Sequence, residues 1–92
     1  MMKIRFTPQF ERDMKRLIKK HYDVSKFEKV VNLLVSNEKE TLLTKYRDHA
    51  LSGNWQGFRE CHIEADWLLI YRIEKNVCEL VLVRTGSHDK IL

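Results

Sequence analysis

The sequence predicts an α+β fold in which an N-terminal strand and two helices pack on an antiparallel sheet built by the C-terminal half. Apolar residues recur at helical spacing through residues 8–37, whereas β-branched and aromatic residues crowd residues 58–85. Each predicted helix has one apolar stripe, which must be buried against a shared apolar neighbour. Short gaps between the apolar runs of the second half favour hairpins. The expected order of elements is therefore about β-α-α-β-β-β.

Composition limits the class of protein. Ninety-two residues fit one domain, spanning 1–92, and 43% hydrophobic residues with only three glycines and one proline favour a globular chain. No apolar run reaches the roughly 18 residues of a membrane span, and the early charges Lys3 and Arg5 interrupt any signal-peptide core. We therefore expect a cytoplasmic protein without a membrane partner. Seventeen Lys and Arg against thirteen Asp and Glu favour polyanionic partners.

The N-terminal third is expected to form a short strand and the first helix. Residues 1–6 alternate loosely, as a half-buried strand does. Thr7 can cap a helix and Pro8 suits its first position, so the helix is expected to continue to about Lys20. Its apolar stripe is Phe10, Met14, Leu17 and Ile18. Its opposite face is basic and carries Arg12, Lys15, Arg16, Lys19 and Lys20.

A second helix and a long connection are expected next. Ser25 and Glu28 form a capping-box pattern, which predicts that the helix begins at Ser25, and it is expected to end near Asn37. Residues 38–56 mix polar side chains with one clear turn signal at Gly53, so we predict an irregular connection with about one helical turn. Long ordered loops often carry function.

Three strands are predicted over residues 58–64, 67–74 and 77–85. The middle run is apolar on both faces, as a central strand is. Alternation places His62 on a mostly polar face together with Glu60. Cys61 and Cys78 lie in apolar runs without metal-ligand spacing, so both are predicted to be buried free thiols in a reducing compartment.

Histidines and charged residues gather around the predicted sheet. His49, His62 and His88 fall at its loops, strand ends or tail. Antiparallel pairing of the last two strands brings the start of one, at Trp67 beside Asp66, near the end of the other, at Arg84. Trp67 can be a core residue or a platform that stacks on an unpaired base, and the sequence leaves both open.

These residue types suit RNA cleavage by the RNA's own 2′-hydroxyl group. That reaction builds negative charge on phosphoryl oxygens, which arginine stabilises, and it needs proton transfers near neutral pH, which histidine performs. A zinc site is disfavoured because the histidine spacings are wide and H-E-x-x-H is absent. A serine hydrolase is disfavoured because no G-x-S-x-G motif is present. We expect neither a metal nor another cofactor.

One stretch of sequence resembles a known family. Residues 46–72, YRDHALSGNWQGFRECHIEADWLLIYR, followed by VRTGSH at 83–88, are similar to the YafQ-type toxins of the RelE/ParE superfamily, and the similarity extends over essentially the whole chain. The resemblance implies a RelE-like fold. It also implies a ribosome-dependent, metal-independent endoribonuclease that cuts messenger RNA in the decoding site and is paired with an antitoxin in a type II toxin–antitoxin system.

The resemblance also assigns functional positions. They fall on His49, His62, Asp66, Trp67, Arg84 and His88. We expect His88 to be the general acid and Arg84 to stabilise the phosphate, with Asp66 or His49 as the base. His62 would orient the substrate. A C-terminal position that is usually aromatic in these toxins holds Leu92 here.

The partners implied are messenger RNA, ribosomal RNA, the antitoxin and, through the antitoxin complex, operator DNA. The basic face of the first helix is expected to hold ribosomal RNA, through Arg12, Lys15, Arg16 and Lys19. Two alternatives remain open from sequence. One is a ParE-like toxin that acts on DNA gyrase without nuclease chemistry, and the other is an RNA- or protein-binding module with structural histidines.

Overall fold

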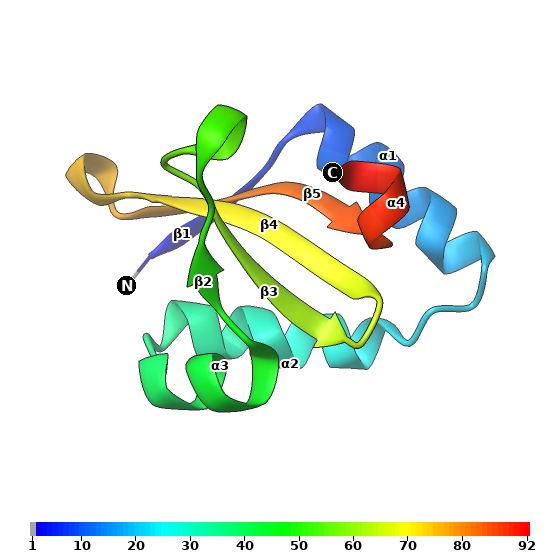
Figure 1. Ribbon diagram of the computed structural model, residues 1–92, viewed down its shortest axis with the longest axis horizontal. Helices are drawn as coiled ribbons and strands as arrows, with labels where there is room; N and C mark the ends of the chain where they lie inside the picture. Colours follow the sequence, from blue (N-terminus) through cyan, green and yellow to red (C-terminus); the bar gives the residue numbers. More distant parts are fainter. Residues whose placement is uncertain (1) are drawn as a thin grey trace.

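A five-stranded sheet forms the centre of the molecule in the computed structural model, which describes residues 2–92 (Figure 1). The strand order is β1-β5-β4-β3-β2. The strands are β1 (Lys3–Phe6), β2 (His49–Ala50), β3 (Arg59–Glu64), β4 (Trp67–Glu74) and β5 (Glu79–Gly86). The helices are α1 (Pro8–Lys19), α2 (Val24–Val35), α3 (Lys39–Tyr46) and α4 (His88–Ile91), and two 3₁₀ turns cover Gly53–Trp55 and Lys75–Val77.

The predicted fold class is confirmed. Strands β3, β4 and β5 form the expected antiparallel meander, and β4, which is apolar on both faces, lies in the middle of the sheet. Its Trp67, Leu69 and Tyr71 face the larger core, while Leu68 and Ile70 face the smaller one. Within residues 2–92, every helix is too short or too polar to cross a bilayer.

Strand β1 joins the edge of the sheet in a direction for which the sequence made no prediction. It pairs in parallel with β5, in a register that places Ile4 opposite Leu80 and Phe6 opposite Leu82. Parallel pairing needs a long crossover connection, and the helices α1, α2 and α3 with the strands β2, β3 and β4 supply it between β1 and β5. The alternation of a four-residue strand does not encode the direction of its partner, so sequence could not show this.

Helix α1 begins as predicted, but its buried face differs. The Thr7 side chain accepts a hydrogen bond from the Phe10 amide at 3.0 Å, and Pro8 occupies the first turn. Ile18, assigned to the apolar stripe, is 51% exposed, whereas Asp13 is fully buried. A buried carboxylate in an amphipathic helix is unusual and needs partners.

Helix α2 begins earlier than predicted because a different residue caps it. The Asp23 side chain accepts a hydrogen bond from the Ser25 amide at 3.0 Å, so Asp23 is the N-cap and Ser25 lies inside the helix. The predicted capping box at Ser25 is therefore wrong. The helix ends at Val35, and Asn37 follows it in a left-handed conformation.

The connection over residues 38–56 is more ordered than predicted. It contains the eight-residue helix α3, a left-handed Arg47 with φ of 52°, and strand β2, which pairs with β3. Only Leu42 of α3 is buried, so its apolar pattern is too sparse to predict a helix of this length. Its helical run is ended by Arg47 rather than by glycine.

Two hydrophobic cores lie on the two faces of the sheet. The larger one joins residues of α1, α2 and α3 to β3, β4 and β5 and includes Phe10, Val30, Leu34, Leu42 and Tyr71. The smaller one joins Leu68 and Ile70 of β4 to Ile91 of α4. Cys61 is buried as predicted, but Cys78 is exposed in a left-handed turn residue before β5, so its predicted burial is wrong.

Candidate active site

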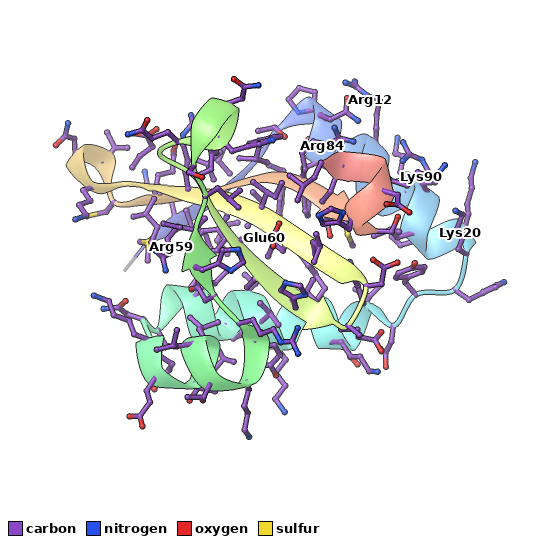
Figure 2. All side chains as sticks on the ribbon, viewed as in Figure 1. Arg12, Lys20, Arg59, Glu60, Arg84 and Lys90 are labelled. Atoms are coloured by element: carbon purple, nitrogen blue, oxygen red, sulfur yellow. The ribbon has the colours of Figure 1, made fainter. Side chains whose placement is uncertain are left out.

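The register of the sheet aligns four site positions across adjacent strands. His49 of β2 lies opposite Glu60 of β3, Glu60 lies opposite Ile70 of β4, and Ile70 lies opposite Arg84 of β5. Adjacent strands are about 4.8 Å apart, so the backbones at Glu60 and Arg84 are separated by about 10 Å. Strand β4 therefore lies between His49 and Glu60 on one side and Arg84 on the other. Figure 2 shows Glu60 on β3 and Arg84 beside α4.

Glu60 joins two of the predicted histidines. Its Oε1 lies 3.5 Å from His49 Nε2 and 3.4 Å from His62 Nε2, and the two imidazole centroids are 6.4 Å apart. Glu60 is 4% exposed, whereas the side chains of His49 and His62 are 49% and 21% exposed. The buried carboxylate thus lies beneath two accessible imidazoles, within ion-pair distance of both.

The backbone around His49 is fixed by a buried network. Tyr71 donates its hydroxyl to Asp48 Oδ2 at 2.6 Å, and Arg59 Nε donates to Asp48 Oδ1 at 3.1 Å. Burial and the hydrogen bond to Asp48 raise the pKa of Tyr71, so its hydroxyl keeps its proton as a donor. His49 Nδ1 lies 2.7 Å from the Arg47 carbonyl, which directs Nε2 toward Glu60.

Arg84 is held by a residue from the other end of the chain. Its Nε donates to Asp13 Oδ2 at 2.8 Å and its Nη2 donates to Asp13 Oδ1 at 3.1 Å. The Arg84 side chain is 23% exposed, so part of the guanidinium is accessible. Burial opposes ionisation of Asp13, but hydrogen bonds from Arg84, the Thr85 amide and Gln9 outweigh it and lower the pKa of Asp13.

Asp66 and His88 meet at the start of α4. The His88 amide donates to Asp66 Oδ1 at 3.2 Å, which fixes the first residue of α4 to the turn between β3 and β4. The side chain of His88 is 67% exposed, as a group that reaches a bound substrate needs to be. Asp66 therefore has a positioning contact in addition to any proton-transfer role.

Trp67 is a core residue, and its predicted role in stacking on RNA is not retained. It is 1% exposed, its indole N–H donates to Thr85 Oγ1 at 2.9 Å, and its ring packs edge-on against Tyr22 at 5.0 Å. A ring that is covered on all sides offers no face to a base. Leu92, at the position expected to be aromatic, is 45% exposed beside α4 and provides no aromatic ring.

Basic residues adjoin the site on two sides. A groove of about 240 Å³ beside His62 is lined by Lys45 and Arg47. The predicted basic residues of α1, Arg12, Lys15, Arg16 and Lys19, are all exposed, and Arg16 also lies 3.7 Å from Asp13. Arg12 and Lys20 of α1 extend from the same end of the molecule as Arg84 and Lys90 in Figure 2.

No metal centre accompanies these residues in the described part of the chain. Within residues 2–92, no three His, Cys, Asp or Glu side chains converge in a way that could hold an ion. Cys61 does not add a ligand, because burial raises the pKa of its thiol and covers its sulfur.

The family model for bacterial toxins of type II toxin–antitoxin systems, YafQ, matches residues 2–92. This chain belongs to the YafQ family. It is 38% identical over 85 residues to the mRNA interferase toxin YafQ of Escherichia coli K12, with 92% of this chain and 89% of that protein covered. Among the solved structures that cover all of this chain are a toxin from Helicobacter pylori and an E. coli complex. A metal-bound toxin from Helicobacter pylori is 40% identical to this chain, with a TM-score of 0.91 and 100% of its own chain covered. The matching chain of the E. coli DinJ–YafQ complex is 33% identical, with a TM-score of 0.84 and 99% of that chain covered.

Sequence reasoning on this YafQ-family chain missed Glu60, Asp13 and Asp48. Glu60 was placed on the polar face of its strand but given no role, because alternation alone does not show that it lies between two histidines. Asp13 lies three residues after Phe10 and four before Leu17, and this spacing was the one signal that an acid is buried on the apolar side of α1. Asp48 precedes His49 directly, and that adjacency is the only hint the sequence contains.

Proposed function

We propose that this chain is an mRNA endoribonuclease toxin that cuts messenger RNA on the ribosome, without a metal, as one catalytic domain of residues 1–92. The observation that carries the proposal is the row across the sheet, with His49, Glu60 and His62 on one side of β4 and Arg84 on the other. The E. coli relative is named an mRNA interferase toxin, which supports the same substrate class.

The chemistry follows from the placement of the ionisable groups. The 2′-hydroxyl oxygen attacks the adjacent phosphorus, the bond from phosphorus to the 5′-oxygen breaks, and a 2′,3′-cyclic phosphate forms. His49 takes the 2′-hydroxyl proton at Nε2, because its Nδ1 faces the Arg47 carbonyl. The Glu60 carboxylate, 3.5 Å from that Nε2, offsets the positive charge that develops on the imidazole. His88 gives a proton to the leaving 5′-oxygen, and Arg84 stabilises the charge on the phosphoryl oxygens.

His49 is preferred to Asp66 as the base because of their partners. The Asp66 carboxylate is already engaged by the His88 amide at 3.2 Å, which positions the general acid. His49 is half exposed, its Nδ1 is held by the Arg47 carbonyl, and its Nε2 lies beside the buried Glu60 carboxylate. His62, on the same carboxylate, orients the substrate.

Ribosome dependence is proposed from the distribution of charge. The basic face of α1 binds ribosomal RNA through Arg12, Lys15, Arg16 and Lys19. The groove with Lys45 and Arg47 continues from His62 and suits a neighbouring phosphate of the messenger. Trp67 supplies no stacking surface, so we expect affinity for RNA to depend mainly on charge and free RNA to be cut poorly.

The partners and location follow from membership in a toxin family. The DinJ–YafQ complex shows a relative assembled with DinJ, and we propose that an antitoxin likewise inhibits this chain and carries it to operator DNA. Ribosomes and messenger RNA place the activity in the cytoplasm. A segment that folds on binding could cover the basic surface of α1 or displace groups of the site.

Primer extension on a defined messenger tests the proposal. Wild type, His88→Ala and, as a matched control, His21→Asn are compared with and without ribosomes. His21 is an exposed histidine with φ of 64° in the turn after α1, and asparagine tolerates that conformation. We expect ribosome-dependent cuts from wild type and His21→Asn and none from His88→Ala.

A metal test and the results for His88→Ala decide whether the metal-free nuclease mechanism holds. Repeating the reaction with EDTA, at a magnesium concentration that keeps ribosomes intact, leaves cleavage unchanged if no other metal is needed. Cleavage that is restored only by adding copper or zinc would contradict the metal-free mechanism. Full activity of folded His88→Ala would remove His88 from the chemistry, and an absence of cuts in every lane would contradict the nuclease proposal.

A further inference from the structure

Helix α1 carries a buried carboxylate, Asp13. Asp13 is 0% exposed, yet it is surrounded by donors. Arg84 contributes Nε and Nη2, the Thr85 amide donates to Oδ2 at 3.2 Å, and Gln9 Nε2 donates to Oδ1 at 3.2 Å. Arg16 adds an ion pair at 3.7 Å. Both carboxylate oxygens are thus occupied, and three of these hydrogen bonds come from Arg84 and Thr85 of β5, about 70 positions away in the sequence.

The edge of β5 explains why a helix residue reaches this place. Strand β1 covers β5 only as far as Leu82, and Thr7 extends the contact through its amide to the Leu82 carbonyl and its hydroxyl to the Val83 carbonyl. Beyond this point the Thr85 amide has no strand partner on that side. Asp13 accepts its hydrogen bond instead, so α1 replaces the missing strand.

A bulge in β5 lies directly before Arg84. Tyr71 pairs with Leu82 and Ile70 pairs with Arg84, so Val83 is an extra residue opposite β4. Bulges turn a side chain away from its regular direction and are frequent beside active sites. Here the bulge and Asp13 both position Arg84. The bulge sets the direction in which the Arg84 side chain leaves the strand, and Asp13 fixes the position of its guanidinium group.

We propose that Asp13 is the positioning residue for Arg84 in phosphodiester cleavage. Asp13 binds the Nε edge of the guanidinium in a fork, which leaves Nη1 and the outer proton of Nη2 for the phosphate. The inference rests on the proposed function, in which Arg84 stabilises phosphoryl oxygens. In this proposal α1 contributes to catalysis through the contact between Asp13 and Arg84, separately from its basic face.

A purely structural role for Asp13 makes a different prediction. If Asp13 only stabilised the fold, its replacement would lower the melting temperature without changing turnover by the folded fraction. If it positions Arg84, its replacement lowers kcat, leaves KM nearly unchanged, and has no further effect once Arg84 is absent. A double-mutant cycle on kcat separates these cases.

The experiment compares wild type, Asp13→Asn, Arg84→Ala and the double variant in single-turnover cleavage on programmed ribosomes, well below each melting temperature. We expect kcat to fall about 10–100-fold for Asp13→Asn, because a guanidinium displaced by about 1 Å loses its alignment. We expect the double variant to lie within about 2-fold of Arg84→Ala. Thr85→Val is the matched structural control, because it removes a buried hydrogen bond to Trp67 yet leaves the Arg84 contacts in place.

A second readout does not depend on cleavage. The Arg84 Nε–H resonance in side-chain NMR is assigned by its loss in Arg84→Lys, and in wild type it should be sharp and slow to exchange with solvent. In Asp13→Asn it should broaden or exchange at least about 10-fold faster, while Thr85→Val keeps the wild-type signal. An unchanged signal in Asp13→Asn overturns the proposal.

The remaining outcomes separate a failure of the positioning role from a failure of the proposed function. If Arg84→Ala cuts messenger like wild type, Arg84 has no part in the reaction, and the positioning role falls with that part of the proposed function. If Arg84→Ala is inactive but Asp13→Asn is fully active, only the positioning role is overturned. If the losses in kcat multiply in the double variant, Asp13 acts independently of Arg84 and the proposal is likewise wrong.

Discussion

Two buried carboxylates, Glu60 and Asp13, organise the charged side chains of the site. Asp13 has a hydrogen-bond donor for each oxygen, whereas Glu60 Oε2 has no partner among the described residues. An unsatisfied buried polar atom costs about 1–3 kcal/mol, and more when it is charged. Burial of Glu60 therefore lowers the stability of the fold. Its position between His49 and His62 indicates a role in the site rather than in packing.

The stability of the fold at acid pH should report the state of Asp13. Its pKa in the folded protein lies below the ordinary value of 3.8, so folding favours the ionised form. The stabilisation is fully present above pH of about 4 and is lost as the pH falls through the lower, folded-state pKa. Unfolding by urea between about pH 5 and pH 2 should show a steeper loss of stability in wild type than in Asp13→Asn.

The control for this measurement is Asp89→Asn, because the Asp89 side chain is fully exposed. Its stability curve should follow that of wild type. At neutral pH, Asp13→Asn should be less stable by about 2 kcal/mol or more, because charged hydrogen bonds to Arg84 and Thr85 are lost. Parallel curves for wild type and Asp13→Asn would show that Asp13 is not the depressed group.

At the scale of elements, the junction between β5 and α4 places the proposed general acid. Gly86 has φ of 147°, a conformation that side chains rarely adopt, and a Cβ there would lie 3.3 Å from Ile91 Cγ2. Ile91 packs with Leu68 and Ile70 in the smaller core. The glycine thus lets α4 fold back on β4, and this return brings His88 to Asp66.

Gly86→Ala should therefore impair cleavage through the position of α4. The strained backbone and the close contact with Ile91 should lower stability by about 1–3 kcal/mol and reduce cleavage about 10-fold or more at temperatures where the protein stays folded. Primer extension and thermal unfolding check the two effects. Gly53→Ala is the control, since Gly53 also has a positive φ but has open space around it. Equal cleavage by both variants would show that the position of α4 is unimportant.

The same elements show what sequence could and could not reveal. The meander, the central β4 and the start of α1 at Thr7 were predicted because each depends on a local pattern of alternation or capping. The parallel pairing of β1 and the fork from Asp13 to Arg84 were not, because they join residues more than 70 positions apart. The predicted site residues His49, His62 and Asp66 acquired their partners only from the register of the sheet.

At the scale of the whole molecule, the sheet divides stability from function. The larger core lies on the face that carries Leu69 and Tyr71, and it is closed by α1, α2 and α3. The positions of Glu60 and His62 alternate with Cys61 and point to the other face, where α4 and the turn at Trp55 cover a smaller core. Helix α1 belongs to both systems, because Phe10 packs in the larger core while Asp13 holds Arg84.

The basic face of α1 should determine how strongly binding to ribosomes depends on salt. Lys15 and Lys19 are exposed, and replacing both with glutamine should lower the slope of log affinity against log salt by about 2, because each phosphate contact contributes about 1. Cosedimentation with ribosomes at several salt concentrations measures the slope. The matched control replaces the exposed Lys29 of α2 and Lys39 of α3 with glutamine. Figure 1 shows α2 and α3 below the sheet, whereas α1 lies at the upper right. The two variants have the same net charge. An equal change of slope in both would mean that total charge, rather than the basic face of α1, determines binding. A change of slope only in the variant that lacks Lys15 and Lys19 would place α1 against ribosomal RNA.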